Sequence, residues 1–274
     1  MTLVQLAIML VCAAAALGSV MAVAWRVQQT SRNSGWVDVS WTFGVGGVAF
    51  LAALAPLRQD LWPAWRQIVV AALVAAWSLR LGFHIVARTR SSGDDPRYSQ
   101  MAAQWGMDAS NRMFWFLQKQ AAVGVVLVMS AVLAAQNPNP AARIQDIVGM
   151  LVLAAAVIGE SLSDTQLRDF KARSVDRNAV CNVGLWRWSR HPNYFFEWLA
   201  WLAYPVIAID ASGSNPWGWL ALIAPMCMYW VLVHVSGIPP LENHMLRTRG
   251  DAFRDYQRRT RPFLPLPLMR QHDP

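Results

Sequence analysis

The sequence predicts an all-α polytopic membrane protein with about seven transmembrane helices, and three observations lead to this fold class. The chain has 274 residues, of which 55% are apolar and only 15% charged, whereas soluble domains carry about 25% charged residues. The apolar residues form long runs without a charged side chain, namely 3–25, 39–57 and 217–235, and about 20 helical residues cross a bilayer. The 15 tryptophans suit a protein whose aromatic rings lie at two membrane interfaces.

The uncharged stretches, and the turns between them, place the predicted helices along the chain. Gln136-Asn137-Pro138-Asn139-Pro140 and Ser212-Gly213-Ser214-Asn215-Pro216 are predicted turns, because clusters of proline, glycine and asparagine end helices. No stretch alternates with a period of two for long enough to predict a sheet. The predicted spans are 3–25, 37–57, 67–87, 113–135, 147–164, 195–210 and 217–236. Ala- and Val-rich spans fill the first 160 residues and are interrupted by an inner loop over 88–112.

The basic residues predict an orientation and argue against a nucleic-acid partner. The formal net charge of +8 would suggest nucleic-acid binding in a soluble protein. However, all of the 24 Lys and Arg residues except Arg58, Arg66 and Arg143 fall on one side of the predicted bundle. Because such residues concentrate in cytoplasmic loops, we expect the N-terminus outside and the C-terminus in the cytoplasm. The three cysteines are too scattered to predict a disulfide framework or a metal site.

Polar residues at or near membrane depth carry the functional information, because an ionisable group there is costly unless it has a partner or a task. Asp38 lies at the inner mouth of the second predicted span. Arg80, His84 and Arg88 are spaced four apart and share a helix face. Arginines that extend from the inner end of a span to the interface explain this stripe equally well.

Two further groups lie in the second half of the chain. Glu160, Asp164, Arg168 and Lys171 share a face where the fifth span leaves the membrane. Salt bridges along one helix would explain them without a ligand, but Glu160 follows a long apolar run and should lie below the headgroups.

The last group is Ser189-Arg190-His191-Pro192-Asn193-Tyr194-Phe195-Phe196-Glu197. Pro192 suits the first turn of a helix, so Asn193 and Glu197 share a face one turn apart. The free N–H groups of such a helix start can hold a phosphate. A polar turn beside the membrane is the alternative, but it does not require Asn and Glu on the membrane side of the proline.

These motifs, taken in order, resemble the DUF1295 family within the steroid 5α-reductase superfamily of membrane proteins. The resemblance covers nearly the full length. Besides the signature 189–197 and the Gly184-Leu185-Trp186 before it, it rests on Val37-Asp38-Val39-x-Trp41, Leu79-Arg80-Leu81, Asp95-Pro96-Arg97-Tyr98, Phe116-Leu117-Gln118, Glu160-x-x-x-Asp164-x-Gln166, Gly237-Ile238-Pro239-Pro240-x-Glu242 and Tyr256-x-Arg258-x-Thr260.

The resemblance implies a membrane reductase that binds NADPH in a cytoplasm-facing pocket. It would reduce a carbon–carbon double bond conjugated to a ketone in a steroid-like or other lipid substrate. It also implies one domain over 1–274, with the helices of 1–140 on the substrate side and those of 141–274 binding the cofactor. The branch and the Ala-rich spans favour a bacterial inner membrane, whose lipids are the other expected partners.

The same resemblance implies roles for individual residues. Asn193 and Glu197 would bind the nicotinamide end, and Asp164, Arg168 and Lys171 the ribose and phosphates. Asp38 and Glu197 are the candidate catalytic residues. The cofactor-binding set is Arg97, Gln118, Asp164, Arg168, Lys171, Arg190, His191, Asn193, Tyr194, Glu197, Glu242 and Tyr256.

The sequence departs from the steroid reductases at the substrate carbonyl. Those enzymes use a Glu on span two and a Tyr on span three; here the matching positions carry Asp38 and, approximately, Trp77. Reduction of an enone needs a proton source for the enolate, and Asp38 is the candidate if burial keeps it protonated. An unsaturated lipid or isoprenoid ketone is therefore as good a substrate candidate as a steroid.

Two other functional classes fit parts of the sequence. Isoprenylcysteine carboxyl methyltransferases, which use S-adenosylmethionine, share Arg190-His191-Pro192-x-Tyr194, Glu242 and Tyr256. Asn193, Glu197 and Asp38 favour the reductase. A scaffold or small transporter is the third class, but the chain lacks the inverted repeats that would support it. The oligomeric state is left open.

Overall fold

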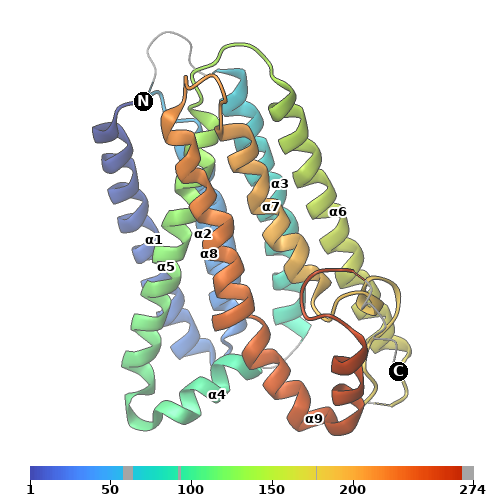
Figure 1. Cartoon of the computed structure of the whole chain (residues 1–274). Helices are drawn as coiled ribbons and strands as arrows, with labels where there is room; N and C mark the ends of the chain where they lie inside the picture. The colour runs from blue at the N-terminus through green and yellow to red at the C-terminus, as the bar shows by residue number, and fades with distance from the viewer. Residues whose placement is uncertain (58–63, 92–93, 177, 267–274) are drawn as a thin grey trace. The chain divides into compact units, whose positions relative to one another are not determined.

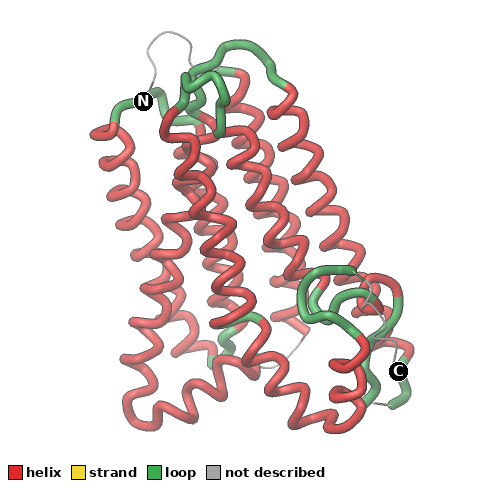
Figure 2. The backbone as a smooth tube through the Cα atoms, in the orientation of Figure 1, coloured by secondary structure: helices red, strands yellow, loops and turns green. Residues whose placement is uncertain are grey.

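The chain is folded almost entirely into helices (Figures 1 and 2). The computed structural model describes residues 1–57, 64–91, 94–176 and 178–266, and this part of the chain contains no β-strand. The α-helices are α1 (Leu3–Ser31), α2 (Gly35–Ala53), α3 (Trp65–Ser91), α4 (Pro96–Trp105), α5 (Ala109–Ala135), α6 (Ile144–Arg173), α7 (Pro192–Ala208), α8 (Ile223–Trp230) and α9 (Ile238–Arg259). Short 3₁₀ segments cover Gly106–Asp108, Gly184–Arg187 and Pro216–Leu222, and a π-helical turn covers Val231–Val235.

The lengths of these helices suit a membrane protein. Six stretches of the described chain are long and apolar enough to cross a bilayer, namely Leu3–Ser31, Gly35–Ala53, Trp65–Ser91, Arg97–Ala135, Ile144–Arg173 and Pro216–Arg259. The remaining predicted span is α7, whose 17 residues rise about 26 Å, close to the thickness of the hydrocarbon core. The predicted all-α polytopic fold is confirmed, and the orientation of its termini stays a prediction.

Helix boundaries differ from the predicted spans where polar residues continue a helix. α3 runs to Ser91 and α6 to Arg173, because a helix keeps its backbone hydrogen bonds when it passes into water. Arg66, expected in an outer loop, lies in the first turn of α3 and is buried. Arg58, expected in the same loop, lies outside the described residues.

The predicted inner loop over 88–112 was wrong in part, since it contains α4 and the turn Gly106–Asp108. The Asp95 side chain accepts a hydrogen bond from the Arg97 backbone N–H and so caps the start of α4. Gly106 ends the helix with a φ of 57°, a conformation that glycine adopts without a steric penalty.

The chain forms two compact units that are interleaved in sequence. The first unit contains 1–151 and 201–227, and the second contains 152–200 and 228–274. α6, α7 and α8 therefore contribute to both units. Within the first unit, α1, α2, α3 and α5 run side by side (Figure 1), and α4 crosses between α3 and α5.

Small residues let the helices of the first unit approach closely. A Cβ at Gly46 on α2 would overlap the Ser78 side chain of α3, and one at Gly124 on α5 would meet Val45 at 2.8 Å. The ring of Trp77, 1% exposed, meets that of Trp201 edge-on at 4.8 Å between centroids. Close glycine contacts and packed indole rings therefore join the buried aliphatic side chains in the interior of the unit.

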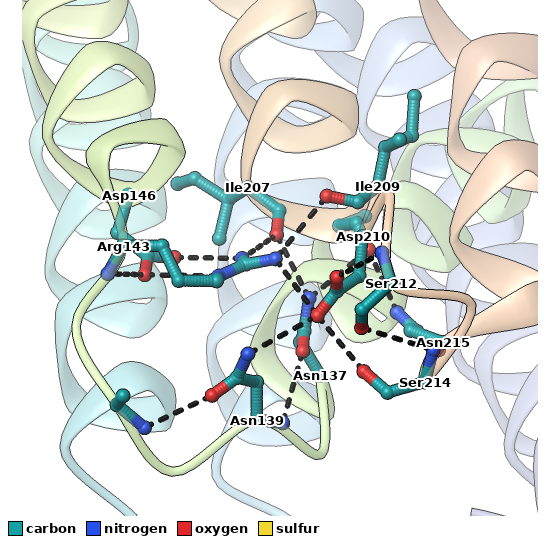
Figure 3. Close-up of polar contacts among 12 residues, drawn as sticks. Asn137, Asn139, Arg143, Asp146, Ile207, Ile209, Asp210, Ser212, Ser214 and Asn215 are labelled. Carbon is teal, nitrogen blue, oxygen red and sulfur yellow. Dashed lines mark hydrogen bonds and ion pairs between the residues drawn. The ribbon is translucent and has the colours of Figure 1, made fainter.

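Polar side chains of the first unit donate hydrogen bonds to the last backbone carbonyls of α7, as Figure 3 shows. The last carbonyls of a helix lack intrahelical partners. Here Ile207 O accepts from Asn137 and Arg143, and Ala208 O accepts from Asn137 and Asn215. Beyond the helix, hydrogen bonds from the Ser212 side chain and backbone and from Ser214 hold the pKa of Asp210 well below its usual range.

The same network contains a buried cluster of charges. Asp146, 2% exposed, pairs with Arg66 through 2.9 Å contacts of Nε and Nη2. Arg143 holds the other face of the carboxylate, with its Nη2 at 3.0 Å from Oδ1. Arg66 also donates to the carbonyls of Asn137 and Ala141. The cluster therefore joins α3, the α5–α6 loop and the start of α6.

Candidate functional site

A carboxylate and a phenol meet in the first unit. The Tyr98 hydroxyl on α4 donates to Asp38 Oδ1 on α2 at 2.7 Å. Arg97 Nη2 lies 2.6 Å from Asp38 Oδ2, and Arg88 Nη2 lies 3.5 Å from the same atom. All three partners are donors, so Asp38 acts here as an acceptor. We name Asp38, Tyr98, Gln120, Arg97, Arg88 and Asp95 the acid–phenol cluster.

Arg97 is held between two carboxylates of this cluster. Its Nε and Nη2 contact Asp95 at 3.0 and 2.9 Å, and Nη2 also reaches Asp38. Burial alone would raise the pKa of Asp95, but the hydrogen bonds and charge of Arg97 outweigh it and lower the pKa below its usual value. Arg97, predicted to bind the cofactor, therefore already has anionic partners within the protein.

A glutamine completes the cluster, and it is not the one that the sequence singled out. Gln120 Nε2 on α5 donates to the Tyr98 hydroxyl oxygen at 3.1 Å. Gln118 instead donates to the Gly18 carbonyl on α1 at 3.3 Å. Residues two apart in a helix point about 200° apart, so only one of the two can face Tyr98.

Tyr98 was present in the motif Asp95-Pro96-Arg97-Tyr98 but received no role from sequence reasoning. Its ring is 3% exposed and meets that of Phe116 edge-on at 6.2 Å between centroids. Trp77, which the resemblance placed approximately at the Tyr position of the steroid reductases, contacts the rings of Trp41 and Trp201. The phenol near Asp38 thus comes from α4, and its position in the sequence could not be found by aligning span three.

In the second unit, α6 and α7 bring the predicted cofactor residues together. Asn193 Nδ2 lies 3.5 Å from Asp164 Oδ1, and a Cβ at Gly159 would overlap the Phe196 ring. Because the two helices are this close, Glu160 and Glu197 are only 4% and 7% exposed.

The two cations that continue the α6 face are accessible. The Arg168 side chain is 71% exposed and lies 3.7 Å from Asp169. Lys171 is also exposed. A carboxylate, an amide and two accessible cations thus follow one another along α6 and the start of α7.

Arg190 is surrounded by acceptors from α9 and the segment after it. Its Nε and Nη2 contact Glu242 at 2.7 and 3.1 Å, and Nη1 donates to the Gln257 and Thr260 carbonyls. Glu242 also accepts from Gln257 Nε2 at 2.7 Å. Arg190 and Glu242, both predicted to bind the cofactor, therefore bind each other.

His191 takes part in the same group of contacts. Burial lowers the pKa of His191, although Glu242 opposes this shift. The neutral ring therefore carries its proton on Nε2, which lies 2.9 Å from Glu242 Oε1. The ring stacks on that of Tyr194, with 5.5 Å between centroids.

Tyr256 holds the turn that precedes α7. Its hydroxyl donates to the carbonyl of Trp186 and lies 3.3 Å from that of Ser189. The Ser189 hydroxyl in turn donates to the Phe263 carbonyl at 2.8 Å. Tyr256 and Glu242 thus tie the C-terminal segment to the 186–191 turn.

The fold and these sites define a multi-pass membrane protein with buried polar clusters on its helices. The chain belongs to the family described as "Protein of unknown function (DUF1295)", which matches residues 24–260, as the sequence motifs predicted. The superfamily that the motifs indicated is consistent with this family. Comparisons with curated proteins and with solved structures gave no match.

Proposed function

We propose that this protein is a membrane-embedded, NADPH-dependent reductase of a carbon–carbon double bond conjugated to a ketone in a lipid substrate. The observation that carries the proposal is the 2.7 Å hydrogen bond between Tyr98 and Asp38. Enone reduction needs a proton donor where charge develops on the carbonyl oxygen, whereas methyl transfer from S-adenosylmethionine needs none at that position.

The residues of α6 and α7 suit the groups of a nicotinamide dinucleotide. Asn193 can pair with the carboxamide, and Asp164 can accept from a ribose hydroxyl. Arg168 and Lys171 are exposed cations that suit phosphates, because charge-assisted hydrogen bonds are the strong ones. Bound NADPH would supply hydride to the β-carbon of the substrate.

The acid–phenol cluster would donate the proton that the substrate carbonyl oxygen takes up during reduction. The Tyr98 hydroxyl can turn from Asp38 to the substrate carbonyl oxygen and give up its proton there. The resulting enol tautomerises to the saturated ketone, and the phenolate regains a proton from water. Arg97 and Arg88 fix Asp38, whose carboxylate accepts from the Tyr98 hydroxyl and so orients it. In this proposal Tyr98 takes the role of proton donor that the sequence had given to Asp38.

Ligand-dependent stabilisation tests the proposal directly. The purified protein in mild detergent is heated with NADPH, NADH or S-adenosylmethionine. A ligand at one hundred times its dissociation constant adds about 2.7 kcal/mol to the stability of the folded state. We expect the largest shift with NADPH. Stabilisation by S-adenosylmethionine alone would replace the reductase with the methyltransferase.

A second arm tests the reaction itself. NADPH oxidation is followed at 340 nm with long-chain enones as substrates, and the saturated ketone is identified by mass spectrometry. The Asn193→Ala and Glu197→Gln variants should reduce turnover far more than they lower the melting temperature. Full turnover in a folded Glu197→Gln variant would remove the cofactor site from the proposal.

A further inference from the structure

The Gln120 carboxamide has a hydrogen-bond partner at one of its two polar atoms and, among the described residues, none at the other. Its Nε2 donates to the Tyr98 hydroxyl oxygen at 3.1 Å. Its Oε1 is buried and meets no donor among the residues that the structure describes. Its backbone carbonyl accepts from Trp41 Nε1 at 3.0 Å.

The orientation of this amide follows from its neighbours. The Tyr98 hydroxyl gives its hydrogen to Asp38, so its oxygen can only accept from Gln120. The amide must therefore present Nε2 to the phenol, and flipping it would bring two acceptors together. The unpaired acceptor is thus a consequence of the Asp38–Tyr98 bond.

An acceptor that is buried without a donor destabilises the protein, because its hydration is lost and nothing replaces it. A ligand that brings an O–H or N–H group to this oxygen removes that cost. A ligand without such a group leaves it in place. Sites of this kind discriminate strongly against analogues that lack the hydrogen-bonding group.

We infer that Gln120 selects substrates that carry a hydrogen-bond donor close to the carbonyl that Tyr98 protonates. This inference rests on the proposed function and names its substrate class. Nε2, which contacts Tyr98, and Oε1, which would accept from the substrate, belong to one carboxamide. The substrate carbonyl and the substrate donor should therefore lie close together. A hydroxyl or amine on a carbon adjacent to the carbonyl carbon fits this spacing, as in an α′-hydroxy enone lipid.

The experiment compares two substrates that differ by one hydroxyl group. The probes are 1-hydroxyhexadec-3-en-2-one and hexadec-3-en-2-one, assayed for kcat/KM with NADPH. We expect the wild-type protein to prefer the hydroxylated probe by about ten- to a hundredfold. In Gln120→Leu this preference should fall to about threefold or less.

Two variants separate selection from damage to the fold. Gln104→Leu changes an exposed glutamine of α4 and should keep the full preference. Gln120→Glu retains acceptor oxygens but loses the N–H that meets Tyr98, so it should keep the preference while kcat falls. Equal kcat/KM values for the two probes in the wild-type protein, or an unchanged preference in Gln120→Leu, would overturn the inference.

A binding arm works without turnover and separates this inference from the proposed function. The saturated pair, 1-hydroxyhexadecan-2-one and hexadecan-2-one, contains no reducible bond, and dissociation constants come from thermal stabilisation. Tighter binding of the hydroxy ketone that disappears in Gln120→Leu supports selection by Gln120 even if no enone is reduced. Equal binding of both ketones, together with reduction of the simple enone, would reject the inference and leave the reductase.

Discussion

The hydroxyl of Tyr98 donates to the carboxylate of Asp38 across 60 residues of sequence. Tyr98 comes from α4 and Asp38 from α2, so the pair forms only when the chain after α3 folds into α4 and packs against α5. Arg97, the neighbour of Tyr98, reaches the other oxygen of the same carboxylate. Two adjacent residues of α4 thus fix both oxygens of Asp38.

Removal of the phenol hydroxyl should abolish most of the proposed activity. In Tyr98→Phe we expect kcat to fall by about a hundred- to ten-thousandfold, the usual contribution of a general acid, with NADPH affinity unchanged. Tyr229→Phe is the matched control, because this tyrosine of α8 is 41% exposed and packs through its ring against Trp198 and Phe263. This control should keep turnover per folded molecule. A Tyr98→Phe variant with wild-type kcat would exclude Tyr98 as donor.

Arg168 and Arg190 should respond differently to truncation, although sequence reasoning placed both at the cofactor. The exposed Arg168 should contribute to phosphate binding. Arg168→Ala should therefore lower the affinity for NADPH by about ten- to a hundredfold, with little change in the free energy of unfolding. Arg190→Ala removes the cation that pairs with Glu242, and because the two side chains are only 10% and 12% exposed, the loss should approach the cost of breaking a buried pair, about 3–5 kcal/mol. Isothermal titration and chemical denaturation in detergent measure the two effects. Equal losses of NADPH affinity and stability in both variants would contradict this assignment.

His191 should make the stability of the protein depend on pH. Burial lowers its pKa in the folded state, and the unfolded value is about 6.5. At a pH between these two pKa values the unfolded chain binds more protons than the folded one. The contribution of His191 to the free energy of unfolding is therefore complete above about pH 6.5 and is lost as the pH falls toward the folded pKa. Melting temperatures between pH 8 and pH 5 should therefore fall more steeply for the wild-type protein than for His191→Gln. Parallel slopes would contradict the buried, neutral histidine.

Asp146 should be a major contributor to the stability of the first unit. Asp146→Ala leaves Arg66 and Arg143 buried and without their shared carboxylate, which should destabilise the fold by about 3–5 kcal/mol. The control is Asp251→Ala, whose side chain is 94% exposed beside Arg254 and should leave the melting temperature nearly unchanged. An Asp146→Ala variant as stable as the wild-type protein would show that the carboxylate contributes little to the free energy of unfolding.

The orientation of the helices can be checked with fusion reporters. The distribution of basic residues predicts that the N-terminus lies outside and the C-terminus in the cytoplasm. A fluorescent protein that matures only in the cytoplasm should therefore be bright, and alkaline phosphatase inactive, when fused after Pro274. The opposite pattern would reverse the orientation without changing the fold.

The sequence alone determined the class of fold, the positions of most helices and the family. Long apolar runs specify spans locally, because each such helix satisfies its own backbone wherever it lies. Local patterns also located the α6 and α7 faces, since Asp164 and Asn193 follow from helical spacing on their own helices. The start of α4 could have been predicted from Asp95 and Pro96, which are common residues at that position.

Only the tertiary structure decided which polar residues meet. Gln118 and Gln120 are two positions apart and point to opposite sides of α5, so the choice between them depends on where α4 packs. Arg190 was predicted to bind the cofactor, and in the structure it pairs with Glu242 of α9. Such partners are chosen by contacts between residues far apart in the chain, and the free energy of pairing a buried charge is realised only when the helices have assembled.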